Sequence, residues 1–172
     1  MHLAILHYTH SPVIGGVERV IRDQAEDLMQ LGHQVDLLDH ALWEKADTSH
    51  YDAIIVHNVF TMPFNLEWTR ELTALAAAKP ELRWINWVHD VAAVNPHYAH
   101  IHWEETLPSA LPVAVSEVRR QDYSQATGLP LESIRVIPNG DENEVVGRIG
   151  SVVRVKVVSP EVSQAANNVL IN

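Results

Sequence analysis

The chain has 172 residues, a formal net charge of -10 at pH 7, 47% hydrophobic residues and no cysteine. This length suits one domain with a sizeable core, and the lack of cysteine excludes disulfides and thiolate chemistry. The negative charge argues against nucleic acid and anionic membranes as partners, and no apolar run approaches the ~20 residues of a membrane span. Because no basic leader precedes the first apolar run, we expect a cytoplasmic location.

Apolar strands alternate with amphipathic helices along the first 140 residues. Residues 3–6 form an apolar run typical of a buried strand, and helical periodicity begins at Val17 and ends before Gly32. Prolines punctuate residues 90–111, which are predicted to be irregular with one short helix. The other predicted strands are 34–39, 51–56, 83–88, 112–115 and 133–137, and the other predicted helices are 65–78 and 117–127.

This alternation predicts an α/β fold, a Rossmann-like parallel sheet with helices on both faces. We assign residues 1–140 to this domain and treat residues 141–172 as an atypical tail. Within the tail, alternation over 151–158 predicts an edge strand and 161–170 a short helix. In open parallel sheets, ligands bind at the carboxyl ends of the strands, so these ends are where a site is expected.

Polar residues follow the predicted strands at this edge. The set comprises His7, Tyr8, Thr9 and His10, then His57-Asn58, His89-Asp90, Ser116-Glu117 and Asn139-Gly140. Turns require polar residues, but they do not require histidine after three of the strands. Ser116 is expected to serve mainly as a helix cap.

Gly15-Gly16 lies between the first strand and the first helix. A glycine pair at such a turn lets a ligand approach bare backbone, and the first helical N–H groups can meet an anion or a sugar hydroxyl. The alternative is that the two glycines only make a tight turn, because the fuller glycine fingerprint of dinucleotide binders is missing.

The order of the motifs resembles a known family. Gly15-Gly16-Val17-Glu18-Arg19, His57-Asn58, Trp87-Val88-His89-Asp90, Val113-Ala114-Val115-Ser116-Glu117 and Ile134-Arg135-Val136-Ile137-Pro138-Asn139-Gly140 together look like the N-terminal half of a family 4 glycosyltransferase. Those enzymes are retaining and have the GT-B architecture. The resemblance covers residues 1 to about 140 and implies sugar transfer from a nucleotide-sugar, a co-substrate, with no further cofactor.

The resemblance implies roles for individual residues. His89 would reach the transferred sugar and Asp90 would orient that region, so these two are the catalytic candidates. The candidate donor- or acceptor-binding residues are Gly15, Gly16, Glu18, Arg19, Asn58 and Asn139. For Glu18 and Arg19, a solvated helix start is an equal alternative. No paired-carboxylate arrangement of a hydrolase can be read from the spacing.

Two departures from the family qualify this expectation. The family's second domain, with its basic pair and glutamate-rich motif for the donor, is not in this sequence. The aliphatic residue that the family usually has between Asn-Gly and the next Asp is also missing, since Asp141 follows Gly140 directly. We therefore expect the chain to be incomplete for transfer unless a partner chain or a self-dimer contributes. The alternative function is a non-catalytic interaction or binding module derived from such an enzyme.

A metal site is a weaker alternative, and no metal is assigned. His97, His100 and His102 lie near Glu104 and Glu105, but no single conformation presents all three histidines well. Among the five tryptophans, Trp84 and Trp87 are expected on opposite faces of one strand, and at least one of them is expected to be buried in the core. Trp103, beside the histidine-rich stretch, is the best candidate for stacking on a sugar ring.

Overall fold

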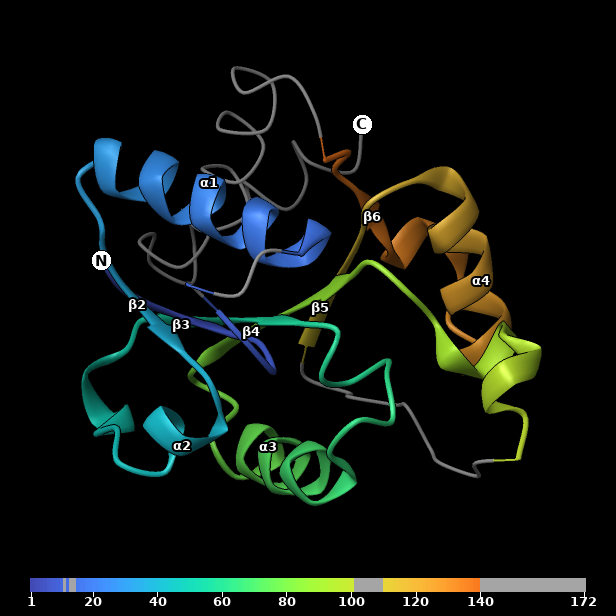
Figure 1. Ribbon diagram of the computed structural model, residues 1–172, viewed down its shortest axis with the longest axis horizontal. Helices are drawn as coiled ribbons and strands as arrows, with labels where there is room; N and C mark the ends of the chain where they lie inside the picture. The colour runs from blue at the N-terminus through green and yellow to red at the C-terminus, as the bar shows by residue number, and fades with distance from the viewer. Residues whose placement is uncertain (11, 13–14, 101–109, 140–172) are drawn as a thin grey trace. The chain divides into compact units, whose positions relative to one another are not determined.

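The computed structural model describes residues 1–10, 12, 15–100 and 110–139, which fall within one compact unit, Met1–Asn139. At its centre is a parallel six-stranded sheet in the order β2-β1-β3-β4-β5-β6 (Figure 1). The strands are β1 (His2–Leu6), β2 (Gln34–Leu38), β3 (Ala53–His57), β4 (Arg83–Val88), β5 (Ala110–Ala114) and β6 (Arg135–Val136). The predicted Rossmann-like α/β fold is confirmed, while the tail elements predicted at 151–158 and 161–170 lie outside the described residues.

The helices begin and end where local chemistry favours it. Asn65 accepts a hydrogen bond from the Trp68 backbone N–H (3.1 Å) at the start of α3, and Gly128, at φ 73°, ends α4 in the left-handed region that favours glycine. The α-helices are α1 (Gly16–Gln30), α2 (His40–Trp43), α3 (Leu66–Ala78) and α4 (Glu117–Thr127). The 3-10 helices are η1 (Thr48–His50), η2 (Ala92–Val94), η3 (Pro96–Tyr98) and η4 (Leu131–Ser133).

The helices cover both faces of the sheet, with α1 on one face and α2 and α3 on the other (Figure 1). Trp84 packs in a core cluster with Trp68 and Leu72 of α3, whereas the Trp87 ring stacks on His57 at 5.6 Å. The two strand tryptophans therefore face opposite sides, as their spacing predicts. Both are buried, and each large apolar side chain contributes about 2–3 kcal/mol of burial energy.

Three differences from the sequence expectation have local causes. The four-residue helix α2, capped by the Asp39 carboxylate, is too short to show a helical period. The described part of the irregular segment holds two 3-10 helices, η2 and η3, in place of one short helix. The last strand, β6, keeps two residues of the five expected, since Ser133 belongs to the 3-10 helix η4 and Ile134 is the C-cap of that helix.

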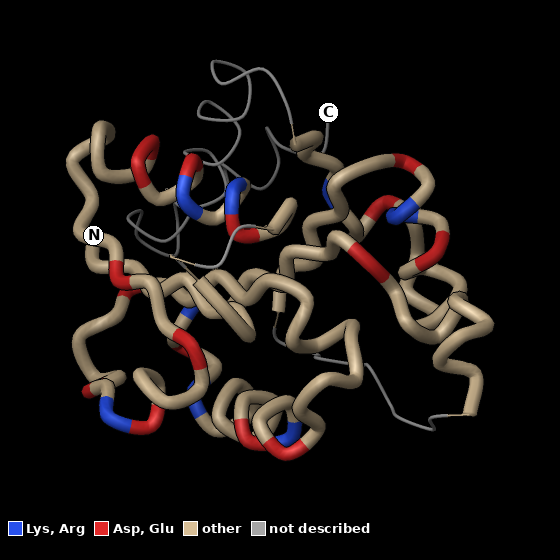
Figure 2. Tube along the Cα trace, viewed as in Figure 1, with Lys and Arg blue, Asp and Glu red and all other residues tan. Residues whose placement is uncertain are grey.

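The charged residues lie mainly on helices and loops and are sparse along the strands (Figure 2). This distribution follows from the burial of the central strands, since an unpaired charge there would be costly. Among the described residues, no helix combines the length and apolar character that crossing a membrane requires.

Candidate functional site

Three histidines converge at the carboxyl edge of the sheet because their strands run parallel and side by side. His57 is the last residue of β3, and His7 and His89 directly follow β1 and β4. All three are buried, His57 completely. The strand that follows β1 in the chain, β2, lies on one side of it, and β3 to β6 lie on the other side, so the strand order reverses between β1 and β3. Ligands usually bind at such a reversal, outside the carboxyl ends of the strands.

A chain of hydrogen bonds runs through two of these imidazoles. His57 Nε2 lies 2.9 Å from Gln24 Oε1 of α1, His57 Nδ1 lies 2.9 Å from His89 Nε2, and His89 Nδ1 lies 3.2 Å from Asn139 Nδ2. Since the Gln24 oxygen can only accept, His57 donates through Nε2 and accepts through Nδ1. His89 then donates through Nε2, and its Nδ1 accepts from the Asn139 amide. Each ring is thus satisfied as a neutral imidazole.

Burial keeps these imidazoles uncharged. Desolvation lowers the pKa of His89 to about 4, with the nearby His7 adding to the effect. Desolvation, together with charge repulsion from His89 and His7, holds the pKa of His57 well below its ordinary value. Desolvation also lowers the pKa of His7, although its hydrogen bond to the His57 carbonyl and the nearby Glu18 act in the opposite direction. The carboxyl edge therefore presents neutral imidazoles near pH 7.

Asn58 fixes the backbone that carries His89 and Asp90. Its side-chain oxygen accepts hydrogen bonds from the backbone N–H groups of His89 (3.0 Å) and Asp90 (3.2 Å). Asn58 itself has φ 60°, a left-handed conformation that asparagine tolerates better than most residues. The backbone conformation of Asn58 and its side-chain oxygen thus both help to position His89 and Asp90.

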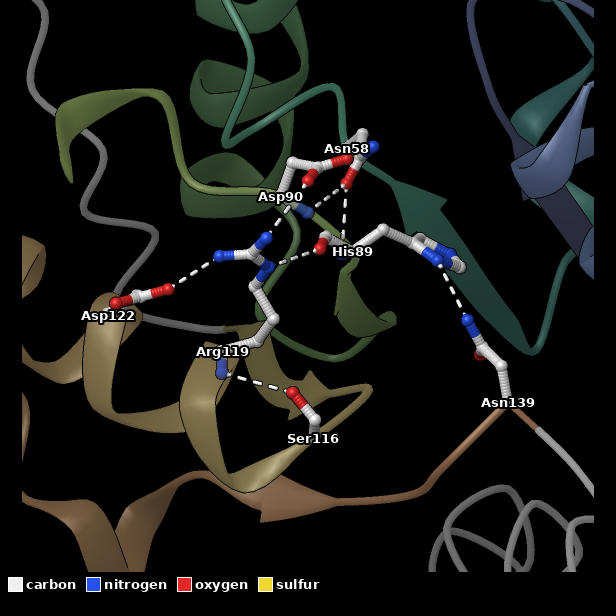
Figure 3. A network of polar contacts seen from close by, with 7 residues as sticks. All are labelled: Asn58, His89, Asp90, Ser116, Arg119, Asp122 and Asn139. Carbon is white, nitrogen blue, oxygen red and sulfur yellow. Dashed lines mark hydrogen bonds and ion pairs between the residues drawn. The ribbon is translucent and has the colours of Figure 1, made fainter. Parts of the chain in front are cut away.

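Arg119 of α4 closes the network from the other side (Figure 3). Its Nε donates to the His89 carbonyl oxygen (2.8 Å), Nη1 donates to Asp122 Oδ2 (2.6 Å) and Nη2 lies 3.5 Å from Asp90 Oδ1. Ser116 accepts from the Arg119 backbone N–H (3.2 Å), which confirms the expected helix cap. Asp90 remains half-exposed, so its carboxylate faces solvent while it is paired.

A groove of 1020 Å³ lies beside Asp90 and Arg119. Its apolar and aromatic lining comes from residues such as Met62, Phe64 and Tyr98, and its polar lining includes Asn95 as well as the Arg119 network. Among the described residues that line it, Arg119 is the only cation, and it is already paired. Because apolar and aromatic side chains lie beside hydrogen-bonding groups, the groove suits a ligand that has both an apolar face and hydroxyl groups.

The glycine turn is shaped by Glu18. A Cβ on Gly15 would collide with the Glu18 carboxylate, whereas Gly16 is open and exposed. Burial acts to raise the pKa of Glu18, but hydrogen bonds from Thr9 and from its own backbone N–H, together with the nearby His7, lower it overall. The anion position expected at the N-terminus of α1 is therefore held by the chain's own carboxylate.

The structure groups some predicted site residues and separates others. Asn58, His89, Asp90 and Asn139 belong to one network (Figure 3). Gly15 and Glu18 lie next to it, since Glu18 Oε1 is 3.8 Å from His7 Nε2. Arg19 does not join: its side chain is 76% exposed and its Nε lies 3.7 Å from Asp23 Oδ2 on the same helix.

Sequence reasoning missed two participants, Gln24 and Arg119, and assigned no role to a third, His57. Gln24 occupies a buried position of α1 between the apolar Ile21 and Ala25, and this polar residue on an apolar face was a readable signal. His57 was noted only as part of a motif, although it links Gln24 to His89. Arg119 gave no such signal, because its role depends on α4 packing against the end of β4.

The histidine-rich stretch considered as an alternative metal site lies partly outside the described part of the chain. His97 and His100 are described and exposed, whereas His102, Glu104, Glu105 and the stacking candidate Trp103 lie outside it. Within the described ranges, the residues that group as possible metal ligands are His2, Asp36 and His50, at the opposite end of the sheet.

No protein-family model matches the chain, and no solved structure matches it significantly. Its functional assignment therefore depends on the geometry of its own residues.

Proposed function

We propose that residues 1–139 form the sugar-binding half of a retaining glycosyltransferase, with a nucleotide-sugar as donor and a hydroxyl compound as acceptor. In this proposal His89 contacts the transferred sugar, and Asn58 and Arg119 hold the backbone of His89 in place. The order of the motifs, which resembles family 4 glycosyltransferases, and their convergence on one edge of the sheet both support the proposal.

The observation that carries the proposal is the neutral, oriented imidazole of His89 at the carboxyl edge. Sugar transfer passes through an oxocarbenium-like state, and a charged imidazolium beside it would be unfavourable. Burial lowers the pKa of His89 to about 4, so the ring recognises hydroxyls without adding positive charge. His89 Nδ1 is bonded to the exposed Asn139 amide, and a ligand hydroxyl can take that amide's place.

The groove beside Asp90 is the proposed place for the acceptor, and His89 is not among the described residues that line it. Tyr98 and Phe64 offer ring faces that suit the apolar face of a pyranose. The Asp90 carboxylate and the Asn95 amide can bond hydroxyl groups. Because Arg119 joins Asp90 to the carbonyl of His89, ligand contact at the groove is coupled to the position of the His89 backbone.

The described residues offer little for a departing diphosphate. Glu18 already occupies the N-terminal end of α1, and the groove's cation, Arg119, is paired with two carboxylates. Stabilising the leaving group requires N–H donors and cations. We therefore propose that a further domain, on this or another polypeptide, supplies the diphosphate contacts.

The Glu18 carboxylate also supports the second candidate, a non-catalytic module that binds a sugar or another uncharged hydroxyl compound. A carboxylate at this position repels a diphosphate but tolerates a neutral ligand. The two candidates differ once a further domain supplies the diphosphate contacts: the transferase then binds nucleotide-sugars more tightly than the free sugars, and the module does not distinguish them.

Calorimetric titration of the purified chain with UDP-, GDP- and ADP-sugars, the free nucleotides and the free sugars tests the proposal. We expect binding of at least one nucleotide-sugar, weakened about tenfold or more by His89→Ala because a buried hydrogen bond to the sugar is lost. The exposed His50→Ala, at the opposite end of the sheet, serves as a matched control and should leave affinity unchanged. Absence of binding to a folded wild-type chain would overturn both candidates.

Asn139→Ala distinguishes two roles for the amide that faces His89. If a ligand hydroxyl replaces the amide at His89 Nδ1, removing the amide leaves affinity unchanged or higher. If Asn139 itself binds the ligand, as the resemblance implies, affinity falls. Circular dichroism of each variant shows whether the fold is retained.

A further inference from the structure

A second histidine cluster lies at the amino ends of the strands, away from the site described above. His2 is the first residue of β1, Asp36 is the central residue of β2 and His50 is the last residue of η1. The pairing of β1 with β2 aligns His2 with Gln34 and Ala4 with Asp36. His2 and Asp36 are therefore close enough for their side chains to meet, and η1 brings His50 alongside them.

The three side chains present ligand atoms to one another. His2 Nε2 lies 2.8 Å from Asp36 Oδ2, and the rings of His2 and His50 are stacked with centroids 4.5 Å apart. One ligand atom from each residue can be chosen so that all three lie within 4.8 Å of one another. Tetrahedral zinc at its usual bond lengths spaces its ligands by about 3.4 Å, so a small turn of the partly exposed His50 closes the set.

Carboxylates dominate the charge around this cluster. Asp52 Oδ2 accepts a hydrogen bond from the His2 backbone N–H (2.8 Å), and Asp47 Oδ2 lies 4.0 Å from His50 Nδ1. A carboxylate behind a ring nitrogen is the usual partner of a metal-bound histidine, because it orients the ring. An opposing charge near η1 is Lys79, which donates a hydrogen bond to Thr48 (3.2 Å).

We propose that His2, Asp36 and His50 form a binding site for a divalent transition-metal ion of the zinc class. Two imidazoles and one carboxylate are a donor set that such ions accept, with water in the remaining position. The ion takes the place of the proton shared between His2 and Asp36, and Tyr51 can keep its hydrogen bond to Asp36 Oδ2 (2.8 Å). The chemistry is independent of the proposed sugar site.

Metal binding here would tie three segments together. β1 and β2 are already paired through their backbones, whereas η1 and the residue after it contact them through the side chains of His50 and Tyr51. An ion held by all three would restrain η1 against the edge of the sheet. We therefore expect zinc to raise the melting temperature of the protein.

The full chain, purified without a histidine tag or a nickel column, is titrated with Co²⁺ and followed by visible absorption. We expect one equivalent of Co²⁺ per chain to give a d–d band that Zn²⁺ then abolishes. His50→Gln and Asp36→Asn should each weaken binding about tenfold or more, because each removes one of three ligands. His97→Gln, which removes another exposed histidine, is the matched control and should bind as the wild type does.

The outcomes separate a built site from scattered surface binding. His50 is exposed enough that its replacement should leave the fold intact, and circular dichroism verifies this. Loss of the band and of the zinc-induced rise in melting temperature in His50→Gln supports the site. Equal binding by His50→Gln and His97→Gln, or no saturable binding by the wild type, overturns it.

Discussion

The two ends of β1 place the same residue type in opposite surroundings. At the carboxyl end, His7 belongs to a group with His57 and His89 that is buried and in which imidazole bonds to imidazole. At the amino end, His2 joins His50 and Asp36, which are partly exposed and are surrounded by carboxylates. The same side chain is thus held as a neutral hydrogen-bonding group at one end and as a metal-ligand candidate at the other.

The difference shows that solvent and neighbouring charge, rather than residue type, decide what a histidine can do. Burial without a close carboxylate disfavours the imidazolium at His57 and His89. Where carboxylates lie near and water has access, a bound metal ion is favoured. The following predictions test whether the two ends differ as described.

The largest expected effect is on stability, from substituting His57. His57→Ala removes the partner of both Gln24 and His89 and leaves a cavity beside Trp87. We expect the free energy of unfolding, measured with urea, to fall by about 3 kcal/mol. The matched substitution at the amino end, His50→Ala, should change it by about 0.5 kcal/mol or less without added metal. Similar losses at both ends would remove the distinction between the clusters.

Acid should destabilise the protein through the buried histidines. Between the ordinary pKa of 6.5 and the value of about 4 for His89, the unfolded chain binds a proton that the folded chain does not. Stability is therefore highest above pH 6.5 and decreases as the pH falls toward 4. His89 alone accounts for about 3 kcal/mol over this window. Urea unfolding at intervals between pH 4 and 7 measures the slope.

His89→Asn tests the source of that slope. The variant keeps a polar side chain but has no group that titrates in the window, so its stability should depend less steeply on pH. The exposed His97→Asn should retain the slope of the wild type. A free energy of unfolding that stays constant from pH 6.5 to 4.5 in the wild type would contradict the assignment of neutral, buried imidazoles.

Asn58 should show a smaller effect that separates its conformation from its hydrogen bonds. Asn58→Ala loses both bonds to the His89 and Asp90 backbone and keeps the left-handed strain, for a cost of about 2 kcal/mol. Asn58→Gly loses the same bonds but relieves the strain, so it should be about 1 kcal/mol more stable than Asn58→Ala. Equal stabilities would show that the conformation contributes nothing.

The fold was largely predictable because most strands are nearly continuous apolar runs and the longer helices repeat apolar residues at helical spacing. β4, for example, was predicted at 83–88, the bounds that it has in the structure. Short elements escaped because they contain too few residues to display a period: α2 and η1 were both missed. Their places are set by side-chain caps and by packing against the sheet.

The site was predictable only in so far as strand ends define it. The histidines and asparagines at the ends of β1, β3 and β4 could be located because parallel strands bring their carboxyl ends to one edge. The direction of the hydrogen bonds through Gln24 depends on the packing of α1, which no local pattern specifies. The His2–Asp36–His50 cluster requires the β1–β2 register and the position of η1, so it could not be derived from spacing.

The smallest expected effect concerns Glu18, the carboxylate that comes closest to the buried histidines at the carboxyl edge. Its charge raises the pKa of His7 and stabilises the start of α1, so Glu18→Gln should lower the pKa of His7 further and cost about 0.5 kcal/mol of stability. Nuclear magnetic resonance titration of the His7 ring measures the first effect, with the exposed Glu26→Gln on the same helix as control. Because the substitution also removes negative charge from the helix N-terminus, binding of inorganic phosphate should strengthen. A His7 pKa that does not change would show that Glu18 acts only on the helix.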